Sequence, residues 1–328
     1  MPRRIIDVGG KTDDTQTVYL LDLEPSHVPG EATAAGIPES RASPNLRARP
    51  EPYAALSYCW GPGEQFHKTT KANVQLRRNG IAVGSLPKSI RDAISVCQGL
   101  GIRYIWIDAL CIVQDDEFDW QRESVRMLDV YANSYITIAV HAAASCHEGF
   151  LGKQGFSQPP WQPSFQVDIG ESRYIELYVC TTNLKNNSGS LWPLSPLMDR
   201  GWTLQEAILP RRIIHYTGNG LLWECAEHAT CECNYMQREG RSSDSQQFLV
   251  KRRFYGSDGL DLREFGVERP NQLASEGWMK LVNMYSRRKL SVWSDRLVAS
   301  RSWRSLSSVQ PWPLGPTKLS HLTFSLSA

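Results

Sequence analysis

The sequence predicts an α/β fold: a mostly parallel sheet flanked by helices, with added β-hairpins and loop insertions. Two observations carry this prediction. Residues 86–140 alternate a helical pattern, an apolar strand at 104–107, a second helical pattern and a strand at 135–140, with short connections between them. Such alternation is typical of β-α-β units, which build parallel sheets. The strand at 104–107 is also apolar on consecutive residues, as expected for a strand covered on both faces.

Both helices of this stretch carry an apolar stripe. Pro87 suits the first turn of the first helix, where its missing N–H is not needed, and Gly99 and Gly101 suit its exit. Apolar residues recur between them at spacings of three and four, at Ile90, Ala93, Ile94, Cys97 and Leu100. The second helix repeats this spacing at Trp120, Ser124, Met127, Leu128 and Tyr131, which we interpret as core and not as a cofactor site.

The remaining elements divide the chain into four parts. Strands are expected at 17–22, 53–60 and 173–180, hairpins around 79–80 and across 211–225, and a helix at 276–288. Residues 24–52 are rich in Pro, Ala and Ser without periodicity, which indicates a flexible surface insertion. The predicted parts are an N-terminal strand with this insertion (1–52), a domain core (53–210), a C-terminal extension (211–299) and an irregular tail (300–328).

Composition limits the classes of partner. Apolar residues make up 41% and charged residues 21%, as in soluble globular proteins. The net charge is only +2, and Lys and Arg are dispersed, so no nucleic-acid partner is expected. No apolar run approaches the roughly 20 residues that span a bilayer, and the start lacks a secretory segment, so we expect a cytoplasmic protein without a membrane partner. Eight scattered cysteines favour reduced thiols.

Polar side chains follow two predicted strands at their ends. Asp108 comes directly after the strand at 104–107, and Ser57, Tyr58 and Trp60 end the strand that begins at residue 53. Because open α/β sheets bind ligands beyond the carboxyl ends of their strands, these residues predict a site, with Gln114 in the following loop. Two alternatives stay open. Asp108 and the acids near residue 115 would cap the next helix and stabilise its N-terminal end, or residues 57–60 would be a core strand with a capped end.

A second candidate site lies in residues 199–209. Trp202 and Glu206 are four residues apart and share one face of a helix, which would present an aromatic ring beside a carboxylate. This pair suits a flat cationic or sugar-bearing ligand. The alternative is a capping box, in which Glu206 bonds back to the helix start at Thr203.

Cysteine and histidine raise two further hypotheses. Cys225, His228, Cys231 and Cys233 are close together, but their spacing fits no paired zinc pattern and no second half follows, so no metal is predicted. Cys111 with His141 as its base would be a nucleophilic pair. No neighbour in the sequence is of a kind that lowers the pKa of this thiol, which speaks against that pair.

Three blocks of sequence resemble the fungal heterokaryon incompatibility (HET) domain family. They are residues 53–61, the stretch from Leu86 through 104–116, and residues 200–206, and a weaker likeness continues in residues 278–297. Val113 stands where the family pattern has Asn or Asp. The sequence after Ala299 no longer resembles family members.

This resemblance implies a cytosolic effector or sensor of non-self recognition in fungi, whose activation leads to cell death. The family is likened to TIR domains, flavodoxin-like α/β units that self-associate and in some cases cleave NAD. It therefore implies no resident cofactor, NAD as a substrate, self-association, and an upstream sensor protein as partner. The alternative is a non-enzymatic module that assembles with its own kind, in which the same blocks are structural.

NAD cleavage would assign roles to these blocks. The reaction needs a carboxylate beside the ribose and an aromatic surface against the nicotinamide. Glu206 with Trp202 is the expected pair and Asp108 the second choice of carboxylate, while Arg200 would hold phosphate. Gln205 completes the predicted ligand-binding set, because it is more polar than an interior requires.

Overall fold

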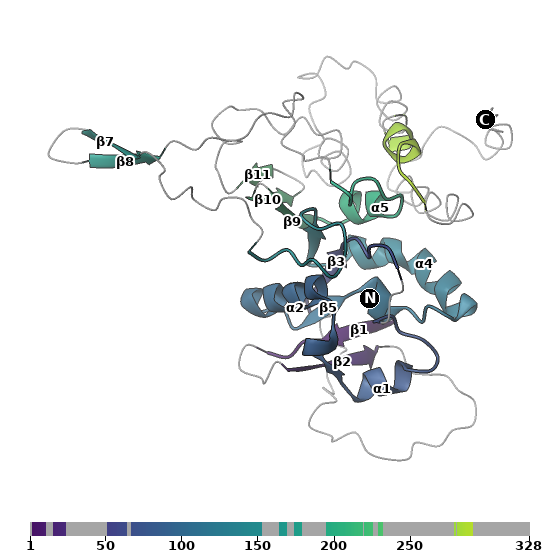
Figure 1. Cartoon of the computed structure of the whole chain (residues 1–328). Helices are drawn as coiled ribbons and strands as arrows, with labels where there is room; N and C mark the ends of the chain where they lie inside the picture. Colours follow the sequence, from purple (N-terminus) through teal and green to yellow (C-terminus); the bar gives the residue numbers. More distant parts are fainter. Residues whose placement is uncertain are drawn as a thin grey trace.

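The computed structural model of the chain describes residues 2–10, 16–23, 51–63, 67–152, 164–168, 174–178, 195–218, 220–225, 229–231, 279 and 281–290. Within these ranges nine strands form one sheet (Figure 1). Their spatial order is β11 (Ala229–Cys231), β10 (Gly220–Cys225), β9 (Arg212–Thr217), β6 (Ile136–Val140), β3 (Tyr53–Ser57), β5 (Tyr104–Trp106), β1 (Arg4–Asp7), β2 (Thr17–Asp22) and β4 (Ile81–Ala82).

The sheet is parallel only at its centre. Strands β5, β3, β6 and β9 pair in parallel, whereas the five pairings outside them are antiparallel. The predicted α/β class is confirmed, but the prediction of a mostly parallel sheet is wrong. The cause is the short connections between β1 and β2 and between β9 and β10, since a short turn can only join antiparallel neighbours.

The order of the parallel strands creates a crevice. Along the chain they come as β3, β5, β6 and β9, but in space as β5, β3, β6 and β9. The chain therefore builds outward in one direction to β5 and then in the other to β6. At such a switch point the carboxyl ends of the two strands, here β3 and β6, border the usual ligand site of an open α/β sheet.

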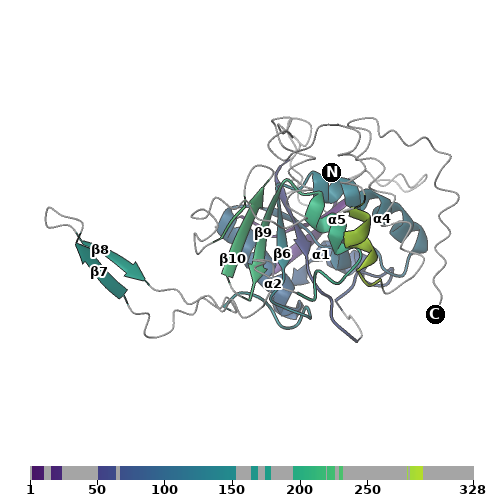
Figure 2. The same ribbon diagram turned by 90° about the horizontal axis from the view of Figure 1, so that it is seen from above.

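Two helices cover opposite faces of this centre (Figures 1 and 2). Helix α2 (Lys88–Leu100) follows Pro87 and ends at Gly101, whose φ of 72° is the left-handed conformation of a helix end. Its predicted stripe is buried except for Leu100. Helix α4 (Glu117–Ala132) is capped by Asp116, and the Tyr131 hydroxyl donates to the carbonyl of Leu56 in β3 at 2.9 Å. The stripe of α2 and the core face of α4 thus pack as predicted.

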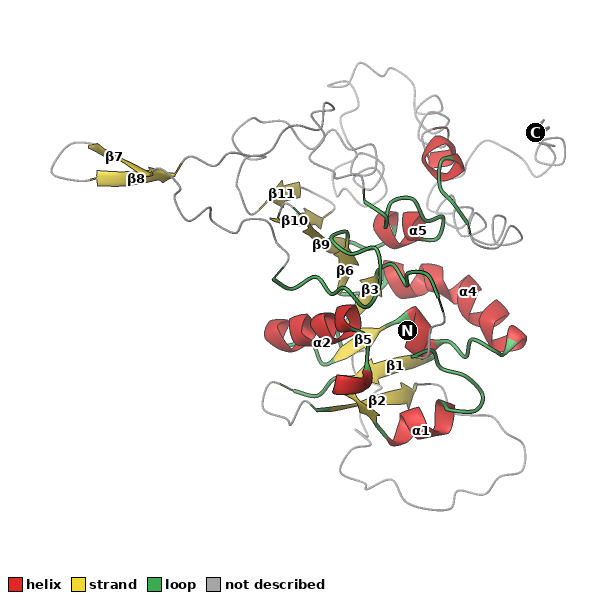
Figure 3. Ribbon diagram, in the orientation of Figure 1, coloured by secondary structure: helices red, strands yellow, loops and turns green. Residues whose placement is uncertain are grey.

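The hairpin predicted around residues 79–80 is wrong. Residues up to Asn79 form helix α1 (Val74–Asn79), and Gly80, with a φ of 142°, separates this helix from the short edge strand β4 (Figure 3). Asn-Gly is a strong hairpin signal, but glycine is also common directly after the end of a helix. The hairpin across 211–225 is confirmed as β9 and β10, with Thr217 opposite Gly220.

Strands from outside residues 53–210 belong to the same sheet. The predicted strand at 17–22 is β2, and β1, which no sequence pattern predicted, lies between β2 and β5.

The predicted strand at 173–180 is β8 (Tyr174–Tyr178), which pairs with β7 (Ser164–Asp168) in a separate two-stranded sheet. Residues 281–286 are helical, as expected. The predicted insertion lies, for 24–50, outside the described residues, as does the tail at 300–328.

Helices that cross a membrane are long and apolar. In the described part of the chain, none combines the length and the apolar character that a membrane crossing requires.

Candidate functional site

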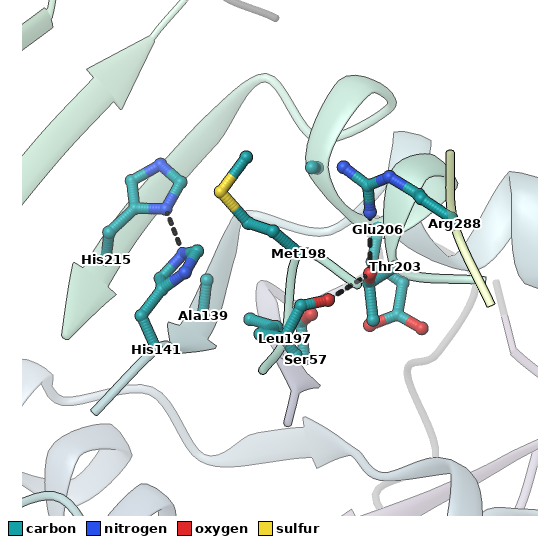
Figure 4. A pocket seen from close by; sticks show the side chains of 10 residues that line it. Ser57, Ala139, His141, Leu197, Met198, Thr203, Glu206, His215 and Arg288 are labelled. Carbon is teal, nitrogen blue, oxygen red and sulfur yellow. Dashed lines mark hydrogen bonds between the residues drawn. The ribbon is translucent and has the colours of Figure 1, made fainter. Parts of the chain in front are cut away.

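A small pocket lies at the switch point between β3 and β6 (Figure 4). Its walls come from the ends of β3 and β6, from helix α5 (Thr203–Ile208), from β9 and from the segment 281–290. The lining residues are Ser57, Ala139, His141, Leu197, Met198, Thr203, Glu206, Ala207, His215 and Arg288. The empty volume of about 260 Å³ counts space that is open to solvent, so the enclosed part of the pocket is smaller and does not hold a whole dinucleotide.

Glu206 is the buried carboxylate of this pocket. Burial raises its pKa from 4.5 to about 7, an effect that Asp108 reinforces. The positive charges of Arg200 and Arg288 and a hydrogen bond with the Ser57 side chain act in the opposite direction. Glu206 can therefore exchange a proton near neutral pH, which is the property of a general acid, a general base or a charge stabiliser.

Glu206 takes no part in a capping box. Helix α5 begins at Thr203, and no side chain caps its first turn. The Thr203 hydroxyl instead lies 2.6 Å from the carbonyl oxygen of Leu197 and accepts a 2.7 Å hydrogen bond from Arg288. The alternative interpretation of the 203–206 sequence is thus wrong, and Glu206 faces the pocket.

Asp108 lies at the end of β5, next to the pocket but not among its lining residues. The indole nitrogen of Trp60 donates to its carboxylate at 3.0 Å, and the backbone N–H of Ala109 donates at 2.7 Å. Burial raises the pKa of Asp108, although Arg200 and these hydrogen bonds lower it. Asp108 is the first residue of the short helix α3 (Asp108–Cys111), whereas Asp116 caps α4. Asp108 therefore stabilises the turn after β5 and also lies close to the charged groups of the site.

Arg200 connects the two carboxylates. Its guanidinium donates to the carbonyl oxygen of Tyr58 at 2.5 Å. Burial alone would lower the pKa of Arg200, but the nearby Glu206 and Asp108 raise it above its ordinary value. One cation is therefore shared by two buried acids, and a change at either acid will be felt by the other.

Other predicted site residues lie away from the pocket. Trp202 is half-buried and packs edge-on against Trp120, with ring centroids 6.4 Å apart. Gln205 is buried in α5. The amide of Gln114 donates to the carbonyl oxygen of Asp108 at 3.1 Å and so holds the turn after β5. Of the predicted catalytic and ligand-binding residues, only Ser57 and Glu206 line the pocket.

A row of buried polar groups that no sequence pattern predicted lies on the opposite wall of the pocket. His141 Nδ1 lies 2.7 Å from the Ser195 hydroxyl, and His141 Nε2 lies 3.0 Å from His215 Nδ1. His215 Nε2 lies 3.2 Å from the Glu224 carboxylate. One signal in the sequence could have found the last pair, because His215 and Glu224 stand among apolar residues on the two strands of the hairpin.

The hypothesis of a Cys111 and His141 pair is wrong. Cys111 is fully buried, and burial raises its pKa to about 12, so its thiol is not activated. Both ring nitrogens of His141 are within hydrogen-bonding distance of other groups. As for the cysteine cluster near 225–233, His228 and Cys233 lie outside the described residues.

The chain matches known proteins over the segment that builds this site. Residues 53–206 match the family model described as heterokaryon incompatibility protein (HET). This segment is a HET domain. The match runs from the start of β3 to Glu206, so Ser57 and Glu206 belong to the HET domain. His215 and Arg288, which complete the pocket, come from the sequence after it.

One relative extends this similarity beyond the HET domain. The chain is 27% identical over 230 residues to heterokaryon incompatibility protein 6, OR allele, of Neurospora crassa. The alignment covers 60% of this chain and 32% of that protein, so the chain spans about a third of the length of its relative. No solved structure matches the chain.

Proposed function

We propose that this chain acts in fungal heterokaryon incompatibility, as an effector whose activation leads to cell death. We further propose that its HET domain does so by hydrolysing NAD or a related nucleotide, with Glu206 as the essential carboxylate. The HET match and the Neurospora crassa relative support the biological role. A buried carboxylate with a pKa of about 7, at the switch point of the sheet, is the observation that carries the reaction.

Strand order supports a TIR-like or flavodoxin-like fold. Numbered along the chain, the parallel strands β3, β5, β6 and β9 lie in the order 2-1-3-4. The flavodoxin-like fold has the order 2-1-3-4-5 and binds its ligand between its first and third strands. The pocket beside Ser57 and Ala139, at the ends of β3 and β6, occupies the equivalent place.

The proposed reaction uses the charge of Glu206. The bond between ribose and nicotinamide breaks, the ring nitrogen keeps the electron pair, and positive charge develops on the sugar. Ionised Glu206 stabilises this charge, and water then adds to the sugar carbon. The pocket is too small for the whole nucleotide, so in this proposal most of the nucleotide lies outside it. Arg288 lines the pocket, and its positive charge suits a phosphate.

Loss of NAD over time, followed by chromatography, tests the reaction on the full chain after induced clustering. Glu206→Gln keeps the shape of the side chain but cannot ionise, so we expect a loss of about 100-fold or more. Glu117→Gln, an exposed change on α4, is the matched control and should cleave like the wild type. Activity should rise as the pH passes about 7, because the ionised form of Glu206 is required.

Two outcomes would contradict the proposal. Clustered, folded wild type that leaves NAD intact would exclude the reaction, and full activity in Glu206→Gln would exclude the assigned residue. Growth arrest on expression in a filamentous fungus tests the biological role separately. An arrest that persists in Glu206→Gln would keep the effector role and reject its chemistry.

The second candidate function is a non-enzymatic module that acts by self-association. Phe118 and Val125, 85% and 67% exposed, are seven residues apart on the outer face of α4. An upstream sensor protein would be the partner that brings copies together. Light scattering at rising concentration should show assembly that Phe118→Ser with Val125→Ser abolishes. Leu76→Ser, at an exposed leucine on α1, is the control, and equal loss in it would reject the α4 surface.

A further inference from the structure

Four buried side chains form a continuous chain of hydrogen-bonding groups beside the pocket. Ser195 Oγ lies 2.7 Å from His141, His141 lies 3.0 Å from His215, and His215 lies 3.2 Å from Glu224. Each of the four is at most 8% exposed. They come from the end of β6, the loop before α5, and strands β9 and β10, so the fold assembles them from distant parts of the sequence. Figure 4 shows the central pair, His141 and His215.

The acid at the inner end sets the direction of every bond. If Glu224 is ionised, its carboxylate can only accept, and His215 Nε2 then donates its proton to Glu224. The Nδ1 atom of this neutral ring is then an acceptor, and His141 Nε2 donates to it. His141 Nδ1 is left as an acceptor facing the hydroxyl of Ser195, which donates. Burial lowers the pKa of His141 well below its ordinary value, which favours the neutral ring that this arrangement requires.

We propose that Ser195 is a nucleophile, activated by His141 through His215 and Glu224, that accepts short acyl groups. The pattern is a hydroxyl within hydrogen-bonding reach of a base that a further group orients. His141 and Ser195 would be the catalytic residues, and His215 and Glu224 would be positioning residues. This site is independent of the proposed NAD chemistry, which rests on the other wall of the pocket.

The surroundings fit a small acyl electrophile. Ser195 is 7% exposed and stands two residues before Leu197, which lines the pocket together with His141 and His215. The limited volume excludes large acyl groups. Arg288 lines the same pocket and provides a positive charge, which favours the negative oxygen of a tetrahedral intermediate.

The step balances without any further reactant. The Ser195 oxygen bonds to the acyl carbon, its proton moves to His141 Nδ1, and the carbonyl electrons move to the oxygen. The intermediate collapses by breaking the bond to the leaving alkoxide or thiolate, which takes the proton back from His141. Water then repeats the sequence and releases the acid. While His141 holds the proton, the charge of Glu224 stabilises the positive ring.

Methanesulfonyl fluoride, a small sulfonyl fluoride, is the probe. It sulfonylates activated serines: the oxygen–sulfur bond forms, fluoride leaves, and the base takes the serine proton. The full chain is treated with the reagent, digested, and mapped by mass spectrometry. We expect the Ser195 peptide to be modified at least tenfold faster than the peptide that carries Ser95, an exposed serine bonded only to a backbone carbonyl.

Glu224→Gln is the decisive variant, because it removes the negative charge that fixes the direction of the chain, with little change in shape. Its amide nitrogen can donate to His215 Nε2, and in that orientation the two bonds that follow are reversed and His141 donates to Ser195. Modification of Ser195 should then fall to the rate of Ser95. His141→Gln removes the base and should have the same effect.

Each result decides the proposal. Fast modification of Ser195 that is lost in Glu224→Gln supports it, provided that circular dichroism shows both proteins folded. Modification of Ser195 no faster than that of Ser95 in the wild type would overturn it. So would a Glu224→Gln protein that reacts as fast as the wild type, because Ser195 would then react without the relay. None of these results depends on whether the chain cleaves NAD.

Discussion

The buried carboxylate of Glu206 should make the stability of this protein depend on pH in a predictable direction. Burial raises its pKa from 4.5 to about 7, a difference that corresponds to about 3 kcal/mol. Between these two pH values the native state binds a proton that the unfolded state has released. The free energy of unfolding therefore falls as pH rises from about 4.5 to 7, and changes no further above that range on account of this group.

Glu206→Gln isolates this contribution, because glutamine is neutral at every pH and similar in shape to the protonated acid. At pH 5 the variant and the wild type should unfold at similar urea concentrations. At pH 8 the variant should be more stable by about 3 kcal/mol. Glu117→Gln, on the exposed side of α4, should show no such pH-dependent difference. A Glu206→Gln effect that is equal at pH 5 and pH 8 would refute the assigned burial and pKa of this carboxylate.

Two further predictions concern the stability of the structure around the site. Asp119→Ala should cost about 3 to 5 kcal/mol in urea unfolding, because it leaves the buried guanidinium of Arg4 without its carboxylate partner; a cost near zero would contradict this account. Gly61→Ala should cost about 1 to 3 kcal/mol more than Gly63→Ala. Both glycines have φ near 90°, but only a Cβ at 61 would meet Ser145, at 2.5 Å, so equal costs would show that this contact yields freely.

Local patterns were sufficient for the centre of the fold. The stripe from Ile90 to Cys97 and the apolar strand at 104–107 each satisfy a short-range rule, and these elements formed where expected. The antiparallel strands beyond β5 were harder to predict, because β1 has only four residues and β4 only two, which is too short for periodicity to be recognised. Whether such strands pair in parallel or antiparallel depends on partners far away in the sequence.

The site was predictable only in part, for a related reason. Ser57 and Asp108 could be placed because they follow strands, and strand ends have a known place in an open sheet. The aromatic partner chosen for Glu206 was Trp202, four residues away on the same short helix. In the structure Trp202 packs against Trp120, because α5 lies against α4 and buries that ring. Helical spacing predicts that two side chains lie on the same face of a helix, but it does not predict which neighbouring element packs against that face.

The pocket includes residues that lie outside the sequence blocks that match the family. The HET match ends at Glu206, yet the charge that faces this carboxylate includes Arg288, which donates to Thr203 and to the carbonyl oxygen of Arg200. The backbone N–H of Gly201 likewise donates to the carbonyl oxygen of Lys289 at 2.7 Å. Strand β9, which follows the match, pairs with β6 and brings His215 to the opposite wall. The functional unit is therefore larger than the matched domain, since both walls of the pocket require residues that come after it.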